Sequence, residues 1–213
     1  SYARAIALSP NVPDTHNNLG NIQKELGEFN NAKASYLRAI TLKPDYAEAH
    51  NNLGNTQKEL GLLNEAQKSY SQAKAFRPEF AEAHSNLGAV LQELGRFADA
   101  KVCYRNAITL KPTLAEAHYN LGNALKQLKE YKDAEVSYAL AISLKPNYTD
   151  ALYNMGRLKH RLGNEQLAHI MLRDAQVFSE FEAEFALAKL CCSLPIVWIP
   201  DGSADPLEIF DMR

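Results

Sequence analysis

The stretch that decides the fold is AEAHNNLGNTQKELGLLNEAQKSYSQAKAFRPEF, residues 47–80, because close variants of it recur along the chain. A glycine returns every 34 residues without a break, and a proline keeps the same interval. The positions are Gly20, Gly54, Gly88, Gly122 and Gly156, and Pro10, Pro44, Pro78, Pro112 and Pro146. Units of this length cannot bury a core alone, so they stack on their neighbours. The sequence therefore predicts a repeat array that works through a surface rather than an enclosed pocket.

Each unit is predicted to hold two helices. Apolar or small side chains fall at 49, 50, 53, 54 and 57, and again at 66, 70, 73 and 76, which is helical spacing twice over. Gly61 is suited to end the first helix, and Pro44 ends the helix before it because proline has no backbone N–H. The second half carries Ala66, Tyr70 and Ala73, an order that lets helix backbones approach while a ring fills the space beside them. No segment has the pattern of a β-strand.

These features resemble the tetratricopeptide repeat, a helix–turn–helix unit of the same length. The resemblance implies an all-α fold, in which helical hairpins stack into a right-handed superhelical solenoid. The expected units are 13–46, 47–80, 81–114, 115–148 and 149–182, and residues 1–12 are expected to be the second helix of a truncated unit. Two departures stand out. Tryptophan, common in the family's first helix, is replaced by His16, His50, His84 and His118, and Lys129 stands where other units have Gly27, Gly61, Gly95 and Gly163.

The repeat pattern stops after the fifth unit. Phe181, Phe185 and Leu190 predict one more amphipathic helix, over about 179–192, that caps the apolar end of the stack. Pro195 and Pro200 favour an extended exit segment over residues 193–213, leading toward a further domain.

Composition excludes several classes of partner. With 25 acidic and 23 basic residues the chain is nearly neutral, whereas a nucleic-acid partner requires a clustered cationic surface. Three cysteines without paired spacing do not make a disulfide framework, which favours a reducing, cytoplasmic compartment. No apolar run approaches the roughly 20 residues needed to span a bilayer. We expect no nucleic acid, no membrane, no metal and no cofactor.

The free face of the first helices carries one residue type without exception. The face opposite the packed stripe is polar, and stacking aligns these faces into a concave groove. The invariant series is Asn18, Asn52, Asn86, Asn120 and Asn154, with Asn21, Asn55 and Asn123 three residues further on. An asparagine amide donates and accepts, so it can hold a peptide backbone without reading its side chains. We expect alanine at Asn52, Asn86 and Asn120 to weaken peptide binding with little change in melting. Alternatively, these asparagines bond neighbouring repeats or remain solvated.

Two other recurring series have structural and functional interpretations. The histidines invite a metal hypothesis, but first helices about 10 Å apart cannot bring two nitrogens to about 2 Å from one ion. They are interpreted as packing residues with a hydrogen bond to the neighbouring helix. The acidic series offsets helix dipoles, or alternatively forms an acidic row that selects basic peptides. Its members are Asp14, Glu48, Glu82, Glu116 and Asp150.

The C-terminal end of the groove changes character. Arg157, His160 and Arg161 replace mostly uncharged residues of the fourth unit, and Tyr119 and Tyr153 lie beside them. This end is predicted to be cationic and aromatic and to take part in peptide binding. Some tetratricopeptide proteins hold a C-terminal carboxylate in this groove, but the lysine expected beside the asparagine is absent from the first units, which argues against that clamp.

The chain resembles the repeat arm of the O-linked N-acetylglucosamine transferase and SPINDLY family in four segments, AHNNLGN, KELG and AITLKPDYAEAH, followed by CCSLPIVWIP. The resemblance implies an arm that presents acceptor proteins to a C-terminal glycosyltransferase region. No residue here matches the transferase motifs, and no phosphate loop, metal cluster or catalytic triad is visible, so this chain is predicted to be non-catalytic. The leading function is peptide recruitment. The alternative is a self-associating scaffold with no attached enzyme.

Overall fold

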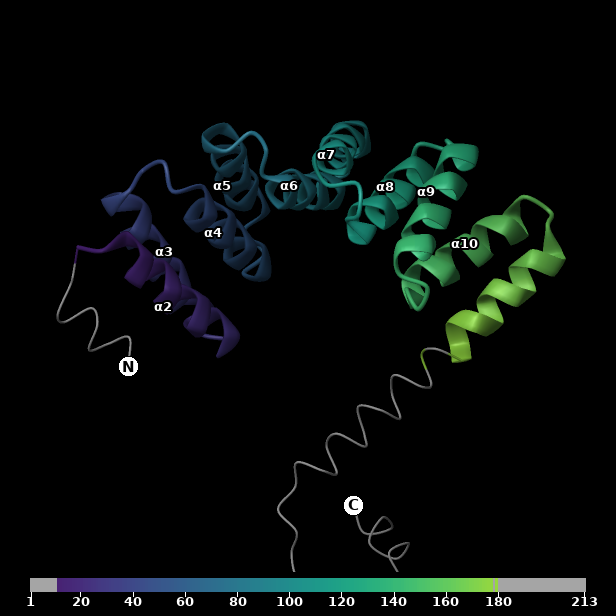
Figure 1. The fold of residues 1–213 in the computed structure, drawn as a ribbon, viewed down its shortest axis with the longest axis horizontal. Helices are drawn as coiled ribbons and strands as arrows, with labels where there is room; N and C mark the ends of the chain where they lie inside the picture. The colour runs from purple at the N-terminus through teal and green to yellow at the C-terminus, as the bar shows by residue number, and fades with distance from the viewer. Residues whose placement is uncertain (1–10, 178, 180–213) are drawn as a thin grey trace, which may run out of the picture.

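The computed structural model describes residues 11–177 and 179, and this part of the chain is helical, with short turns and no strand (Figure 1). The predicted all-α fold is therefore confirmed. The first helices of the units are α2 (Pro13–Glu25), α4 (Ala47–Glu59), α6 (Ala81–Glu93), α8 (Ala115–Gln127) and α10 (Thr149–Arg161). The second helices are α3 (Phe29–Leu42), α5 (Leu63–Phe76), α7 (Phe97–Leu110), α9 (Tyr131–Leu144) and a helix over 165–177.

Three of the predicted segments cannot be compared with the structure. The helix expected over 1–12, the capping helix over 179–192 and the exit segment over 193–213 lie outside the described residues, apart from residues 11, 12 and 179. Residue 11 is in a turn, and Val12 is the extended N-cap of α2.

The hairpins follow one another along a curved path (Figure 1). Within a unit the two helices pack closely, and each second helix also packs on the next first helix. First helices of neighbouring units contact one another as well, α2 with α4, α4 with α6 and α6 with α8, and no comparable contact joins neighbouring second helices in the described part of the chain. The first helices therefore line the concave side of the array.

A tyrosine–glycine contact joins the two helices of a unit. Tyr36, Tyr70, Tyr104 and Tyr138 are fully buried on the second helices. A Cβ added at Gly88 would stand 2.7 Å from the Tyr104 ring, and the same clash, at 2.6 to 2.7 Å, is found at Gly20, Gly54 and Gly122. The recurring glycine is thus required because the ring lies directly against the backbone of the first helix.

The turn inside each unit reverses the chain with one left-handed residue. In the second unit Gly61 has φ of +73°, its N–H bonds to the carbonyl of Lys58, and Leu62 N–H bonds to the carbonyl of Gln57. This pair of bonds is the Schellman arrangement, which satisfies the last carbonyls of a helix. Lys129 adopts the same geometry with φ of 63°, so the fourth unit makes the same turn with a residue that is strained there.

Candidate functional site

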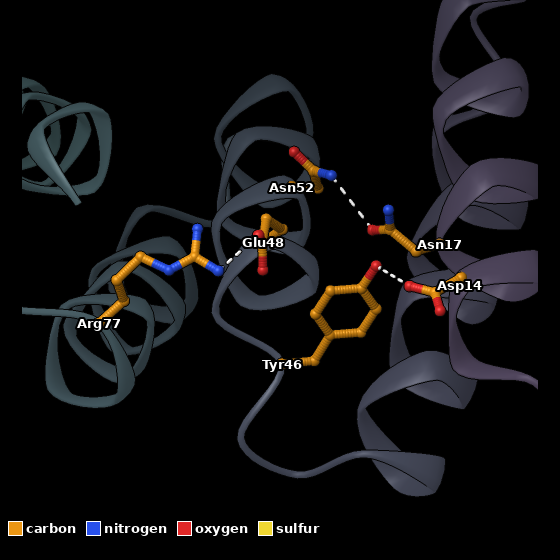
Figure 2. Close-up of polar contacts among 6 residues, drawn as sticks. All are labelled: Asp14, Asn17, Tyr46, Glu48, Asn52 and Arg77. Carbon is orange, nitrogen blue, oxygen red and sulfur yellow. Dashed lines mark hydrogen bonds and ion pairs between the residues drawn. The ribbon is translucent and has the colours of Figure 1, made fainter.

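The candidate site is the concave groove, the surface formed by the free faces of α2, α4, α6, α8 and α10. The asparagines of the invariant series lie on it: Asn18 is exposed, and the other four are partly exposed. Their amides are not free, because neighbouring units use some of them. Figure 2 shows the arrangement between the first two units, where the Asn52 Nδ2 is directed at Asn17 and its Oδ1 is turned away.

The asparagine amides form hydrogen bonds from one unit to the one before it. Asn52 Nδ2 donates to Asn17 Oδ1 at 3.1 Å and to Asn21 Oδ1 at 3.2 Å. Asn86 Nδ2 repeats the pattern, donating to Asn51 at 3.0 Å and to Asn55 at 3.3 Å. These bonds fix the orientation of the amide, so that the Oδ1 atom is the group left for a ligand. The alternative interpretation, that these asparagines bond neighbouring repeats, thus applies to Nδ2 of Asn52 and Asn86, and peptide binding through Oδ1 stays a prediction.

The same network reaches into the core. Tyr36 Oη donates to Asn21 Oδ1 at 2.8 Å, and Tyr70 Oη donates to Asn55 Oδ1 at 2.7 Å. Tyr138 Oη donates to Asn123 in the same way, at 2.7 Å. The asparagine three residues after the invariant one is therefore mainly an acceptor for the tyrosine hydroxyl, and its oxygen is already occupied. This role was missed by reasoning from the sequence, although the fixed spacing of Tyr70 from Asn55 was the signal.

The network is interrupted between the third and fourth units. Ala89 occupies the place of Asn21, Asn55 and Asn123, and Ser85 occupies the place of Asn17 and Asn51. The buried Tyr104 hydroxyl consequently has no hydrogen-bond partner. Within the described residues, the Asn120 side chain makes no hydrogen bond either, because alanine offers no acceptor. Asn120 is therefore the one member of the series between two described units whose amide is wholly available.

Replacing Ala89 by asparagine is expected to stabilise the protein. The new Oδ1 can accept from Tyr104, as Asn55 accepts from Tyr70, and each bond contributes about 0.5 to 1.5 kcal/mol. The lower helix propensity of asparagine costs about 0.5 kcal/mol. A rise in the urea midpoint measures the difference. In a Tyr104→Phe background most of the gain should disappear, and an unchanged midpoint in the native background would contradict the argument.

Two of the three asparagines in the triple-alanine prediction form hydrogen bonds between units. Asn52 and Asn86 join units through partly buried hydrogen bonds, so replacing them lowers stability as well as removing groove groups. We therefore expect alanine to lower the melting temperature at these two positions, and nearly unchanged melting stays the prediction for Asn120 alone.

The C-terminal end of the groove brings the predicted cationic and aromatic residues together. Asn154 Nδ2 donates to Tyr119 Oη at 3.0 Å, and Lys126 Nζ donates to Asn154 Oδ1, also at 3.0 Å. Tyr119 lies against the Tyr148 ring, 4.9 Å between centroids. The Arg157 guanidinium lies 5.7 Å from the centroid of the exposed Tyr153 ring. Lys126 was missed as a member of the site.

The other recurring polar residues have partners inside the protein. His50 Nε2 lies 2.9 Å from the Pro44 carbonyl oxygen, and His84 and His118 repeat this contact with Pro78 and Pro112. The histidines therefore bond the loop before their own helix, not the neighbouring helix. Glu48 pairs with Arg77 and Glu82 with Lys111, while Asp14 accepts from the Tyr46 hydroxyl (Figure 2). Lys111 holds the pKa of Glu82 below its usual value.

These pairs leave three of the five first-turn carboxylates occupied, which weakens the alternative of an acidic row. In residues 11–177 and 179, no group of three or more histidine, cysteine, aspartate or glutamate side chains could hold a metal ion. None of the helices in the same part of the chain is long and apolar enough to cross a membrane.

Comparison with known families identifies the repeat. A family model described as TPR repeat matches residues 20–61, 58–95 and 91–129, and a second, described as Tetratricopeptide repeat, matches residues 115–148. The chain belongs to the tetratricopeptide repeat family. Tetratricopeptide repeat domains are protein-interaction modules, which is the broad function assigned here. No curated protein matches the chain.

Solved tetratricopeptide repeat structures share the architecture. A crystal structure of MamA is 26% identical, with a TM-score of 0.71, covering 78% of this chain and 96% of that one. YrrB, described as a TPR protein with an unusual peptide-binding site, is 24% identical, with a TM-score of 0.69 over 89% of this chain and 97% of its own. PilF of Pseudomonas aeruginosa is 22% identical, with a TM-score of 0.75 and 86% coverage of both chains. The likeness to YrrB and PilF shows the fold alone.

Proposed function

We propose that this tetratricopeptide repeat array binds an extended peptide segment of a partner protein along the concave groove. The observation that supports the proposal is the orientation of the asparagine amides. At Asn52 (Figure 2) and Asn86 the bonds to the preceding unit use Nδ2 and leave Oδ1 without a bond, whereas Asn154 Oδ1 accepts from Lys126. Asn120 makes no side-chain hydrogen bond within the described residues, so its whole amide is available. An oxygen acceptor presented in this way suits a backbone N–H, which every residue except proline carries.

The spacing of the units determines which backbone groups of such a peptide the asparagines contact. Neighbouring first helices are about 10 Å apart. An extended strand advances about 3.3 Å per residue, so successive asparagines meet backbone groups about three residues apart. The binding is therefore tolerant of side chains and periodic in the backbone. Side-chain selectivity has to come from other groove residues, such as Tyr153, Arg157 and Arg161.

A backbone N-methylation scan tests this proposal. Peptides that bind the chain are selected from a random library, and each N–H of one binder is methylated in turn. Binding should fall at positions about three residues apart and stay nearly unchanged between them. Asn120→Ala should weaken the unmodified peptide about three- to tenfold, the equivalent of one hydrogen bond, with no change in melting.

The matched control is Asn106→Ala, which removes an exposed asparagine from α7 on the outer side of the array. Anisotropy measures both affinities, and circular dichroism measures both melting curves. Binding that is indifferent to N-methylation and to Asn120→Ala would show that the peptide does not lie along the asparagines.

We also propose that the array recruits acceptor proteins for a glycosyltransferase region in the same polypeptide, in the cytoplasm. The proposal is supported by the sequence resemblance given above, which ends in residues 191–200. These residues lie outside the described part of the chain. None of the relatives named above is described as a glycosyltransferase. Sugar transfer to a groove-binding peptide, assayed with the protein from its natural source, tests this assignment.

One observation favours the alternative of self-association. Val102 and Val136, at equivalent places on α7 and α9, are 58% and 59% exposed, and Leu140 is 45% exposed nearby. Apolar side chains gathered on the outer side are typical of contact surfaces. Light scattering distinguishes the two functions, because a scaffold would show a mass above that of one chain that falls on Val102→Lys and Val136→Lys substitution.

A further inference from the structure

The C-terminal end of the groove contains a cavity of about 520 Å³ whose ionisable lining residues are all basic. Lys126 on α8 and Arg157, His160 and Arg161 on α10 surround it, and Leu158 and Leu172 contribute apolar surface. No carboxylate of the described residues lines it. Cavities of this size accommodate small ligand groups, and convergent charged side chains determine which group is bound.

The charges here differ from those at the equivalent positions of the second and third units. There, Lys58 pairs with Glu93 of the next unit, with 3.5 Å between Nζ and the carboxylate. One pair of units further on, Lys126 stands in the place of Lys58, and Arg161 stands in the place of Glu93. An ion pair is thus replaced by two like charges. A nearby like charge disfavours the charged form of a basic side chain, and an anion bound between the cations would offset that cost.

Within residues 11–177 and 179, Lys126, Arg157 and Arg161 form no ion pair with a carboxylate. Lys126 Nζ donates to the neutral Asn154 side chain at 3.0 Å. Arg157 and Arg161 lie over the Tyr153 and Tyr131 rings, at 5.7 Å and 5.0 Å from the ring centroids. His160, by contrast, lies beside Glu165, 2.8 Å from Nδ1 to the carboxylate. Burial, and next the Arg157 charge, hold the pKa of Lys126 below its usual value, and a bound carboxylate would reverse that effect.

We propose that this cavity binds an acidic side chain of the peptide held in the groove, with Lys126, Arg157 and Arg161 as the groups that contact its carboxylate. The proposal rests on the groove function above. Because the asparagines are alike, one acidic residue held in the cavity determines which peptide residues face which asparagines. The guanidinium groups supply paired donors for a carboxylate, and the tyrosine rings hold them in position.

The test uses three fluorescein-labelled peptides and anisotropy titration. The first is pentaglutamate with both ends blocked, the second is blocked pentaglutamine, and the third is pentaglutamine with a free C-terminal carboxylate. We expect the blocked pentaglutamate to bind at least about tenfold more tightly than either pentaglutamine, and the difference to shrink at high salt. Equal binding of the three peptides overturns the proposal. Equal binding of pentaglutamate and the free-carboxylate peptide also overturns it, in favour of a terminal carboxylate.

Paired variants locate the binding. Arg157→Gln with Arg161→Gln should weaken pentaglutamate at least about tenfold, whereas the lysine versions of both should retain part of the affinity. Arg38→Gln with Arg105→Gln is the matched control, since it removes the same charge from exposed positions on α3 and α7. An equal loss in the control pair would assign the effect to net charge and overturn the site.

The two proposals fail separately. If Arg157→Gln with Arg161→Gln abolishes pentaglutamate binding while Asn120→Ala and N-methylation have no effect, the cavity stands and the asparagine groove does not. If library peptides bind through Asn120 but acidic residues give no advantage, the groove stands and the cavity proposal is overturned.

Discussion

Gly88→Ala is expected to destabilise the protein by about 1–3 kcal/mol, although the same exchange in an ordinary helix interior stabilises it by about 1 kcal/mol. The sign reverses because the new Cβ would stand 2.7 Å from the Tyr104 ring, which is fully buried and has no space to move into. Chemical denaturation followed by circular dichroism measures the change. The effect is expected to extend to the contact between α6 and α7 and to the units stacked on either side, since stability in repeat arrays depends on neighbours.

A double variant separates the ring clash from other effects of the substitution. Tyr104→Ala removes the ring atoms that the Gly88 Cβ would meet, so Gly88→Ala in that background should cost much less than in the native chain. Leucine is unsuitable, because Leu172 lies 2.9 Å from a Cβ added at the equivalent Gly156. The two substitutions should therefore be strongly non-additive. An equal cost in both backgrounds would mean that the glycine is required for a reason other than the tyrosine.

Alkaline pH is expected to unfold the array through its buried tyrosines. Burial, helped by Glu25, raises the pKa of Tyr36 to about 12, and burial raises the pKa values of Tyr70, Tyr104 and Tyr138 further. In the unfolded chain these hydroxyls ionise near 10. Below that pH they are neutral in both states and contribute no pH dependence. Above it the unfolded state loses protons that the folded state keeps, so the free energy of unfolding falls by about 1.4 kcal/mol per pH unit for each tyrosine.

The four tyrosines together give a loss of about 5 kcal/mol per pH unit well above pH 10, which melting curves across that range measure. Tyr104→Phe is the informative control because its hydroxyl has no partner. The variant should be as stable as the native chain at neutral pH. Above pH 10 its free energy of unfolding should fall less steeply, by about 1.4 kcal/mol per pH unit, because one tyrosine fewer titrates. Tyr70→Phe removes a 2.7 Å bond to Asn55 and should cost about 1 kcal/mol at neutral pH. Melting that is independent of pH above 10 would show that the tyrosines ionise in the folded state.

The periodic sequence predicted the fold well because each local signal had one structural meaning. Gly88 and Tyr104 recur at a fixed separation, and a small residue facing a large one specifies how two helices cross. The turn at Gly61 followed from its position after the first helix, and it has the positive φ that glycine favours.

The site was less predictable because periodicity does not show which atom of a side chain is used. The asparagine series was found, but the direction of its amide depends on Asn17 and Asn21 in the preceding unit. Contacts between units join residues 28 to 35 positions apart, and the identity of one partner cannot be read from the other. Lys126 was missed because its neighbours Asn154 and Arg157 belong to the next unit.

The absence of asparagine at positions 85 and 89 also bears on the mechanics of the array. On the outer side the third and fourth units stay linked by the ion pair between Lys101 and Glu130, 2.6 Å long. On the inner side, within residues 11–177 and 179, asparagine bonds join the first three units, and none joins the third unit to the fourth. We expect bending to concentrate there, with the outer contact as the pivot and the inner edge opening or narrowing. We expect the distance between the N-terminal asparagines and the cavity at Arg157 to vary with this bending, which would let the array bind partners whose acidic residue lies at different distances from the rest of the bound segment.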